Sequence, residues 1–332
     1  MPNTQPVTDK REIVEFILDQ SRDHLVSIYP IAAITRDQKG DELVEMAELI
    51  DAGVVAFSDD GKSVANSLIL RRALEYARMF DVPIIEHCED VDLATGGAMH
   101  EGFVSSNLGI DGIPAIAEDI VVARNIFLTE YTKSKIHIAH ISTAGSVELV
   151  RQAKDRGIAV TAEATPHHFT LTDEEVRSFD ANLKMNPPLR SKEHVEAILK
   201  GLKDGTIDAI ATDHAPHSIE EKDVEFTEAP FGIIGLETAL GLVVTQLIEP
   251  GILTWQQAVE KLARNPYRII GLEEPQIKEK ASANLTIVDP KAEWTVDKTK
   301  LKSRSRNTPF HNRKMRGKVM YVFNNGYYYS TI

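Results

Sequence analysis

Four residues able to bind a metal ion follow apolar stretches that have the composition of buried β-strands. Asp60 (or its neighbour Asp59) follows VVAF, His87 follows VPIIE, His140 follows KIHIA and Asp213 follows IDAIAT. A single histidine in such a position is usually a hydrogen-bonded structural residue, but four metal-type residues after near-successive strands favour a shared site. Carboxylates and neutral imidazoles are ligands that Zn²⁺ and similar ions prefer, so we predict a divalent metal site.

The stretch TDHAPHS adds a candidate for proton transfer. Asp213 ends the last predicted strand, where its carboxylate can contact both a metal and its water. A metal ion lowers the pKa of bound water to about 7, and a carboxylate beside it can take the proton and return it to a leaving nitrogen. His217 lies four residues further on, so we expect it above the site as a donor to a substrate carboxylate or amide.

The remaining histidines and the cysteine carry less information. On a strand, His137 and His140 face opposite sides, and His140 is the better ligand because it is nearer the strand end. His167 and His168 in TPHHF are expected to pack or to support other residues, and Cys88 to be a small core residue. Surface positions are expected for His24, His100, His194 and His311.

Short apolar strands alternate with helical patterns over the first 250 residues, which is typical of a parallel sheet wrapped by helices. No phosphate-binding glycine loop supports a nucleotide-binding open sheet, and polar residues after several strands are typical of a barrel. Six strand–helix units plus one helix without its strand are predicted, so an eight-unit barrel lacks its first unit and second strand. The predicted strands are 25–34, 54–61, 82–90, 135–143, 158–169 and 207–218; the predicted helices are 9–21, 41–52, 65–79, 114–132, 145–156, 191–203 and 232–247.

The last part of the chain has a different character. A capping-box sequence, TWQQ, predicts a helix from Thr254 to about Leu262. ASANLTIVD (281–289) and GKVMYVFNNGYYYS (317–330) then predict strands of a small β module, with a tight turn at NNG (324–326).

Composition excludes several functional classes. A net charge of −13 argues against a nucleic-acid partner, because phosphate binding needs clustered Lys and Arg. No apolar run reaches the roughly 20 residues that span a bilayer, so no membrane partner is expected. The single cysteine fits a reducing compartment, and we expect a cytoplasmic protein.

Eight motifs in order over residues 1–238 resemble the dihydroorotases, specifically the bacterial class I type of the amidohydrolase superfamily. The motifs are MPNTQP, FSDDG, IIEHCED, HIAHIST, TPHHF, KMNPPLR, ATDHAPH and APFGIIGLET, with ANLTIVD and the region near NTPF resembling the family's tail. The resemblance implies a metal-dependent (β/α)8 TIM-type barrel with a small C-terminal β module, here residues 1–270 and 271–332. It also implies reversible, zinc-dependent cyclisation of N-carbamoyl-L-aspartate to (S)-dihydroorotate in pyrimidine biosynthesis.

The resemblance also implies roles for individual residues. It makes Asp213 a metal ligand as well as the acid/base, and it favours Asp60 over Asp59 as the inward carboxylate. One or two Zn²⁺ ions are implied. The implied metal ligands are Asp60, His87, His140 and Asp213, and the implied substrate contacts are Asn3, Asn186, His217 and the backbone of Phe231 and Gly232.

One family motif has no counterpart in this sequence. In the family the first barrel strand carries an HxH pair followed by an arginine, and no such stretch occurs here. MPNTQP is then the exit loop of an absent second strand, and we expect weak metal binding with little or no ring-closing activity. A misplaced start or a fragment explains this best. The alternatives are a catalytically silent chain that partners aspartate transcarbamoylase and, ranked lower, a hydantoinase or allantoinase relative; a homodimer is a further expectation.

Overall fold

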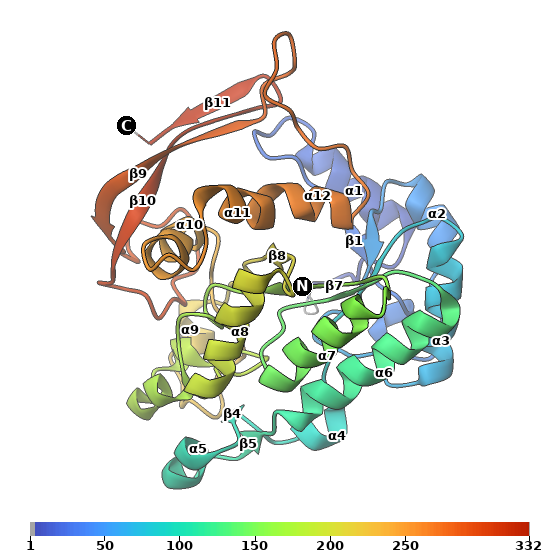
Figure 1. Cartoon of the computed structure of the whole chain (residues 1–332), viewed down its shortest axis with the longest axis horizontal. Coiled ribbons are helices and arrows are strands. Elements are labelled where there is room, and N and C mark those ends of the chain that lie inside the picture. Colours follow the sequence, from blue (N-terminus) through green and yellow to red (C-terminus); the bar gives the residue numbers. More distant parts are fainter. Residues whose placement is uncertain (1–3, 332) are drawn as a thin grey trace.

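The computed structural model describes residues 4–331, and its centre is a parallel sheet of six short strands (Figure 1). Their order in the sheet follows the chain, and every neighbouring pair is parallel. The predicted α/β architecture with six strand–helix units is therefore confirmed. The strands are β1 (Ile31–Ala32), β2 (Ala56–Phe57), β3 (Ile84–Glu86), β6 (Ile136–Ile138), β7 (Val160–Ala164) and β8 (Ala209–Ile210).

Amphipathic helices cover the outside of this sheet. In α8 (Lys192–Asp204), Val195, Ile198 and Leu202 recur at helical spacing and are all buried. Figure 1 shows α3, α6, α7 and α8 in succession along one side of the sheet, and consecutive members are in contact. None of the helices within residues 4–331 is long and apolar enough to cross a membrane. The other helices of this part are α1 (Arg11–Ser21), η1 (Arg36–Gln38), α2 (Met46–Asp51), α3 (Ser67–Arg78), α6 (Ile116–Thr132) and α7 (Ala144–Asp155).

The predicted strand 25–34 is wrong for most of its length, because only Ile31 and Ala32 pair with a neighbour. β1 is an edge of the sheet within the described residues, and Val26, Ile28 and Tyr29 are exposed. An apolar stretch at an edge has no second strand to continue its ladder, so composition alone overestimates the strand's length.

The segment after β3 contains structure of its own, although the sequence predicts neither a helix nor a strand between residues 90 and 114. Two short parallel strands pair with each other, with a helix on either side of β4. Figure 1 places this insertion at one end of the molecule, beside the start of α6. The insertion comprises α4 (Val91–Ala94), β4 (Met99–His100), α5 (Phe103–Leu108) and β5 (Gly112–Ile113). Further short helices are η2 (Asp173–Ser178), η3 (Ala181–Leu183) and α9 (Ile219–Lys222).

The helix predicted for 232–247 begins later than expected. Ile233 pairs with His214, and the backbone N–H of Gly235 donates to Nδ1 of His214 at 3.1 Å, which ties this stretch to the loop after β8. The helix therefore starts at α10 (Ala239–Val243) and continues as η4 (Val244–Ile248).

The predicted capping box at Thr254 is confirmed. The N–H of Gln257 donates to Oγ1 of Thr254 at 3.2 Å, and the N–H of Thr254 donates to Oε1 of Gln257 at 2.8 Å. The helix that starts here is α11 (Trp255–Val259), which continues as η5 (Glu260–Arg264) and α12 (Asn265–Ile269).

The predicted C-terminal β module is an antiparallel sheet in the order β11–β10–β9. Asn325 and Gly326 both have positive φ, 50° and 78°, as a tight hairpin turn requires. Figure 1 shows α10, α11 and α12 between this sheet and the barrel strands. The strands are β9 (Leu285–Thr295), β10 (Lys314–Asn324) and β11 (Tyr327–Ser330).

Within the described residues the parallel sheet ends at β1 on one side and β8 on the other. A cavity of about 510 Å³ is lined by both edge strands and by the helix end at Ile269 and Ile270. Side chains fill the interior of a complete eight-stranded barrel. In this chain the interior stays accessible, and the cavity reaches Asp60, His140 and Asp213.

Candidate metal and substrate site

A second cavity, of about 320 Å³, lies where several of the parallel strands end. The structure brings eight of the nine predicted site residues to its wall, while Asn3 lies outside the described residues. Residues more than 170 positions apart in the sequence thus meet at one place. The eight are Asp60, His87, His140, Asn186, Asp213, His217, Phe231 and Gly232, and Gly61, Met185, Ala215 and Pro230 complete the lining.

Three of these residues form a cluster with the geometry of a metal site. Nδ1 of His87 lies 3.1 Å from Nε2 of His140, which in turn lies 3.4 Å from Oδ1 of Asp60. One ligand atom from each residue lies within 4.8 Å of the other two. The two imidazole rings meet edge to face, with centroids 4.8 Å apart. Donor atoms that converge in this way can share one ion.

The donor chemistry of this cluster fits a zinc-type ion. Two imidazole nitrogens and one carboxylate are a common catalytic zinc ligand set, in which the fourth position stays open. The second ring nitrogen of His87, Nε2, is buried without a hydrogen-bond partner among the described residues and faces Oε1 of Glu89 at 3.8 Å. A carboxylate near the outer nitrogen is the arrangement that orients metal-binding histidines.

Charges in the cluster shift the pKa values of its members. Burial alone would lower the pKa of His140, but its hydrogen bond to Asp60 and the charges of Asp213 and Asp60 raise it to about 9. Burial acts to raise the pKa of Asp60, yet the hydrogen bond and charge of His140 lower it well below the ordinary range. Without a metal, the site therefore contains an imidazolium–carboxylate pair.

Asp213 behaves differently from Asp60. Burial raises the pKa of Asp213 to about 6, against the opposing charge of His140. A carboxyl group with this pKa exchanges a proton near neutral pH, as an acid/base group must. The backbone is unusual here too, because Asp213 and His140 both have positive φ, 45° and 31°. Such conformations are uncommon outside glycine and often occur at functional sites.

The neighbouring carboxylates Asp59 and Asp60 have distinct surroundings. Asp59 is buried, and its Oδ1 accepts the backbone N–H groups of Ile34 at 2.8 Å and Thr35 at 3.1 Å. The hydroxyl of Thr35 donates to its other oxygen. Asp59 thus fixes the end of β1, while Asp60 faces His140.

The predicted substrate contacts form the other wall of the cavity. Asn186 donates through Nδ2 to Oε1 of Glu89 at 3.2 Å, which leaves its buried Oδ1 without a partner among the described residues. His217 lies 2.8 Å through Nε2 from the carbonyl of Phe231, so this nitrogen carries the proton. The N–H of Gly232 donates to the carbonyl of Lys184 at 2.9 Å. The buried Oδ1 of Asn186 is thus an acceptor available to a ligand.

Asn307, in the family-like stretch NTPF, supports the cavity wall although no local pattern in the sequence indicates this role. Asn307 is buried, and its Nδ2 donates to the carbonyls of Ala215 at 2.8 Å and Gly232 at 3.0 Å. Its Oδ1 accepts the N–H of His217 at 3.3 Å. One side chain from the connection between β9 and β10 thus holds two segments of the cavity wall together.

Two histidines expected at the surface are placed elsewhere. His100 is 6% exposed, and its Nδ1 lies 3.2 Å from Nη1 of Arg190. His194 is half-buried and accepts the N–H of Ala144 through Nδ1 at 2.9 Å. The insertion after β3 folds over this region, which no periodicity in the sequence indicates. His167 and His168 are buried, as expected for packing residues, and so is Cys88.

Known proteins similar to this chain point to one family. A family model described as Dihydro-orotase-like matches residues 1–146. The chain is 53% identical over 327 residues to the dihydroorotase of Acetivibrio thermocellus, and the matched region covers 98% of this chain and 77% of that protein. It is 55% identical over 317 residues to the dihydroorotase of Pelotomaculum thermopropionicum, covering 96% and 74%. The chain thus spans about three quarters of these curated relatives.

Solved structures agree on the fold. The L-hydantoinase (dihydropyrimidinase) of Arthrobacter aurescens matches with a TM-score of 0.87 at 22% identity, over 99% of this chain and 76% of that one. A D-hydantoinase matches with a TM-score of 0.79 at 18% identity, over 99% and 76%. At these identities the likeness shows the TIM-type amidohydrolase fold alone. The identities of 53% and 55% to relatives that are matched over most of their length show that this chain belongs to the dihydroorotase family.

Proposed function

We propose that the 320 Å³ cavity performs the reversible ring closure of N-carbamoyl-L-aspartate to (S)-dihydroorotate, a step of pyrimidine biosynthesis. The observation that carries this proposal is the composition of that one cavity. Its wall combines the cluster of Asp60, His87 and His140 with Asp213 and with the free acceptor of Asn186. The volume is in the range of small-molecule sites, which begins at about 300 Å³.

The cluster of Asp60, His87 and His140 would hold one Zn²⁺ ion, and Asp213, which lines the same cavity, is proposed as a further ligand of it or of a second ion. A zinc ion bound there supplies a Lewis acid for the amide carbonyl and lowers the pKa of water to about 7. Zinc, rather than another divalent ion, is favoured by the two imidazoles. Three protein ligands with an open fourth position are sufficient for a catalytic zinc site.

Asp213 serves as the acid/base in this proposal. In the direction of ring opening, its carboxylate accepts a proton from the attacking water and then delivers it to the departing ring nitrogen. Without a metal ion, burial raises the pKa of Asp213 to about 6, so the carboxylate is largely ionised at neutral pH and can accept a proton. Asp213 lines the same cavity as Asp60 and His140, which supports a proton transfer beside the proposed metal site.

Asn186 and His217 position the substrate in this proposal, together with the backbone of Phe231 and Gly232 and with Asn3. Oδ1 of Asn186 is a buried acceptor suited to a ureido or ring N–H group. The following remain predictions from the sequence: a homodimer, association with aspartate transcarbamoylase, a cytoplasmic location, and the division into domains 1–270 and 271–332.

Two other candidate functions make different predictions. The first is a chain that binds zinc without turning over substrate. The three clustered donors of the described residues support zinc binding by itself. The likeness to hydantoinases favours the other, ring opening of hydantoins or dihydropyrimidines. Asp60 occupies the position where those enzymes are expected to have a modified lysine, and Lys62 is exposed beyond the strand end.

The test assays the purified, zinc-loaded chain in both directions with N-carbamoyl-L-aspartate and dihydroorotate, beside the Acetivibrio thermocellus relative. We expect slow turnover that Asp213→Asn lowers by about 10²-fold or more, the typical contribution of a general acid/base, with zinc still bound. Bound zinc without turnover in either direction would identify the silent chain. Turnover of hydantoin alone would identify the other activity.

A further inference from the structure

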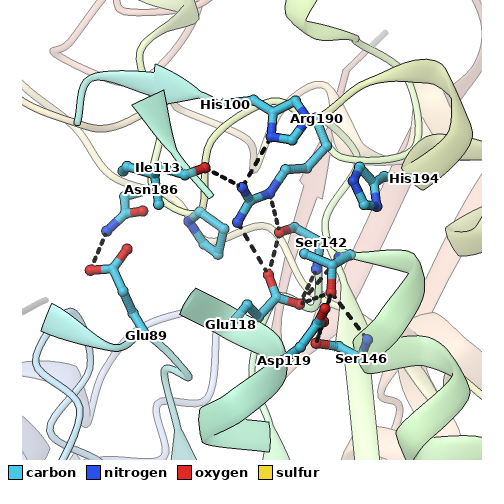
Figure 2. Close-up of polar contacts among 12 residues, drawn as sticks. Glu89, His100, Ile113, Glu118, Asp119, Ser142, Ser146, Asn186, Arg190 and His194 are labelled. Carbon is cyan, nitrogen blue, oxygen red and sulfur yellow. Dashed lines mark hydrogen bonds and ion pairs between the residues drawn. The ribbon is translucent and has the colours of Figure 1, made fainter. Parts of the chain in front are cut away.

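A network of buried polar side chains surrounds Arg190, which follows the cavity residue Asn186 along the chain (Figure 2). Arg190 is 3% exposed, and its Nη1 donates to the carbonyl of Ile113 at 2.8 Å and lies 3.2 Å from Nδ1 of His100. Its Nε donates to Oγ of Ser142 at 3.0 Å, and its Nη2 lies 3.7 Å from Oε2 of Glu118. The guanidinium therefore has partners in every direction, which fixes its orientation.

Glu118, on α6, holds the backbone that follows His140. Its Oε1 accepts the N–H groups of Ser142 at 3.0 Å and Thr143 at 3.1 Å, and the hydroxyls of both residues also donate to the carboxylate. Figure 2 shows these contacts converging on one carboxylate beside the start of α7. Glu118 is 3% exposed, so Arg190 is the cation that compensates its charge.

The backbone at His140 needs such a support. β3 and β6 pair in the register Ile84 with Ile136 and Glu86 with Ile138, so His87 is opposite Ala139 and not His140. If β6 continued regularly, His140 would point to the opposite face from Ala139. The φ of 31° at His140 turns its imidazole toward His87 instead. A non-glycine residue keeps this conformation only where its surroundings hold it.

Arg190 also belongs to the segment that carries Asn186. The backbone N–H of Asp173 donates to the carbonyl of Arg190 at 3.0 Å, and the ring of His168 contacts the carbonyl of Pro187 at 2.8 Å. Asn186 itself contacts Glu89, two residues beyond His87 along the chain. Through its side chain Arg190 thus joins the segment with Asn186 to the segment with His140.

We propose that Arg190 and Glu118 are positioning residues of the site, which set the geometry of His140 and Asn186 without contacting substrate. This proposal rests on the proposed function only for the identity of the metal and substrate that the site binds. A planar guanidinium that bonds in several directions at once has no equivalent in lysine. Loss of either partner would leave a buried charge uncompensated, so the effect must be separated from simple destabilisation.

The variants are Arg190→Met, Glu118→Gln and the milder Ser142→Ala, which removes the acceptor of Nε without leaving a charge unpaired. Arg151→Met is the matched control, because Arg151 on α7 pairs with Glu148 and Asp204 away from the cavity. Folding is followed by circular dichroism and thermal unfolding. The position of His140 is followed in the metal-free protein by the NMR resonance of its imidazole, assigned with His140→Asn. Zinc affinity is measured by competition with a chelator, and the site geometry by the absorption spectrum of bound Co²⁺.

We expect the His140 resonance to shift in Arg190→Met, Glu118→Gln and, less strongly, Ser142→Ala, but not in Arg151→Met. Zinc affinity of the folded variants should fall about 10–100-fold, as when a residue that orients a metal ligand is removed, and the Co²⁺ spectrum should change. Variants that melt earlier yet retain the resonance, the affinity and the spectrum would show a merely structural role. If Arg190→Met does not fold, the same measurements on Ser142→Ala decide between a positioning role and a merely structural one.

Two further results have a defined meaning. If the unmodified chain binds neither zinc nor cobalt, the proposed function fails, while the metal-free resonance still tests the positioning role. If kcat falls in Ser142→Ala with KM unchanged, the effect lies at His140; if KM rises alone, it lies at Asn186. Unchanged kcat and KM together with an unchanged resonance would overturn the proposal.

Discussion

Nδ1 of His87 lies 3.1 Å from Nε2 of His140, although the two residues are 53 positions apart in the chain. Adjacent parallel strands bring them together, and Oδ1 of Asp60 lies 3.4 Å from the second of these nitrogens. Two imidazole nitrogens at this distance share either a proton or a metal ion.

Replacing either histidine of this pair should abolish tight zinc binding. His87→Ala and His140→Ala each remove one of the three clustered donors, so the affinity should fall by more than the roughly 10–100-fold cost of losing a residue that merely orients a ligand. Competition with a chelator of known affinity measures this. His311→Ala, at an exposed histidine, is the control. Equal zinc affinity in His87→Ala and the control would contradict the assigned cluster.

The neighbouring residues Asp59 and Asp60 should separate stability from metal binding. Asp59→Asn weakens the acceptor of two backbone N–H groups and a hydroxyl, so it should lower the free energy of unfolding by about 1–3 kcal/mol. Asp60→Asn removes the anion that pairs with His140, but the Asp60 side chain is partly exposed, so it should cost less stability than Asp59→Asn and should weaken zinc binding. Chemical denaturation and zinc titration of both variants measure the two effects. A reversed pattern would mean that Asp59 is the ligand.

The sequence predicts which residues make up the site better than it predicts the residues that hold them in place. Asp60, His87 and His140 could be grouped because the ends of adjacent parallel strands meet at one edge, whatever the details of the loops. The capping box at Thr254 and the turn at Asn325 are local motifs, whose geometry depends on a few neighbouring residues.

The residues that hold the site in place are buried by contacts between distant segments, and no local sequence pattern encodes such contacts. Arg190 lies in the irregular stretch NPPLR, where neither helical nor strand periodicity indicates burial. His100 is buried because the insertion after β3 folds back against Arg190. Asn307 reaches Ala215 across 92 positions of the chain. Such residues resemble ordinary surface polar residues until the tertiary structure is known.

Asn307 provides the third test. Asn307→Ala removes donors to the carbonyls of Ala215 and Gly232 and leaves both buried groups without this partner. We expect a loss of about 1–3 kcal/mol in the free energy of unfolding. Since these carbonyls belong to the cavity wall, KM should rise more than kcat falls. Asn284→Ala, at an exposed asparagine, is the control. A stability loss with an unchanged KM would confine Asn307 to the fold.

Gly232 provides the fourth test. Its φ is 150°, and a β-carbon added there would lie 2.8 Å from both the carbonyl oxygen of Ala215 and the ring of His217. Gly232→Ala must therefore displace the imidazole of His217, and substrate binding should weaken while zinc binding persists. Gly251→Ala is a suitable comparison, because Gly251 also has a positive φ but has open space around it. Equal effects of the two substitutions on KM would remove His217 from the proposed substrate contacts.

Stability at acid pH should depend on His100. Burial, then the charges of Arg190 and His194, lower the pKa of His100 from 6.5 to about 3. Between these pH values the unfolded chain binds the proton and the folded chain does not, so the free energy of unfolding falls as the pH falls. Above pH 6.5 both states are neutral at this residue, and its contribution to the slope vanishes.

His100→Gln keeps an acceptor for Arg190 but cannot titrate. The variant should therefore lose less stability than the unmodified chain on acidification, by about 2 kcal/mol at about pH 5. Urea denaturation at a series of pH values gives the difference, with His24→Gln, at an exposed histidine, as the control. The comparison between variants cancels the titration of the carboxylates, which unfolds many proteins in acid. If the curves of His100→Gln and the unmodified chain ran parallel from pH 6.5 downward, His100 would have to be charged in the folded state, against its burial beside Arg190.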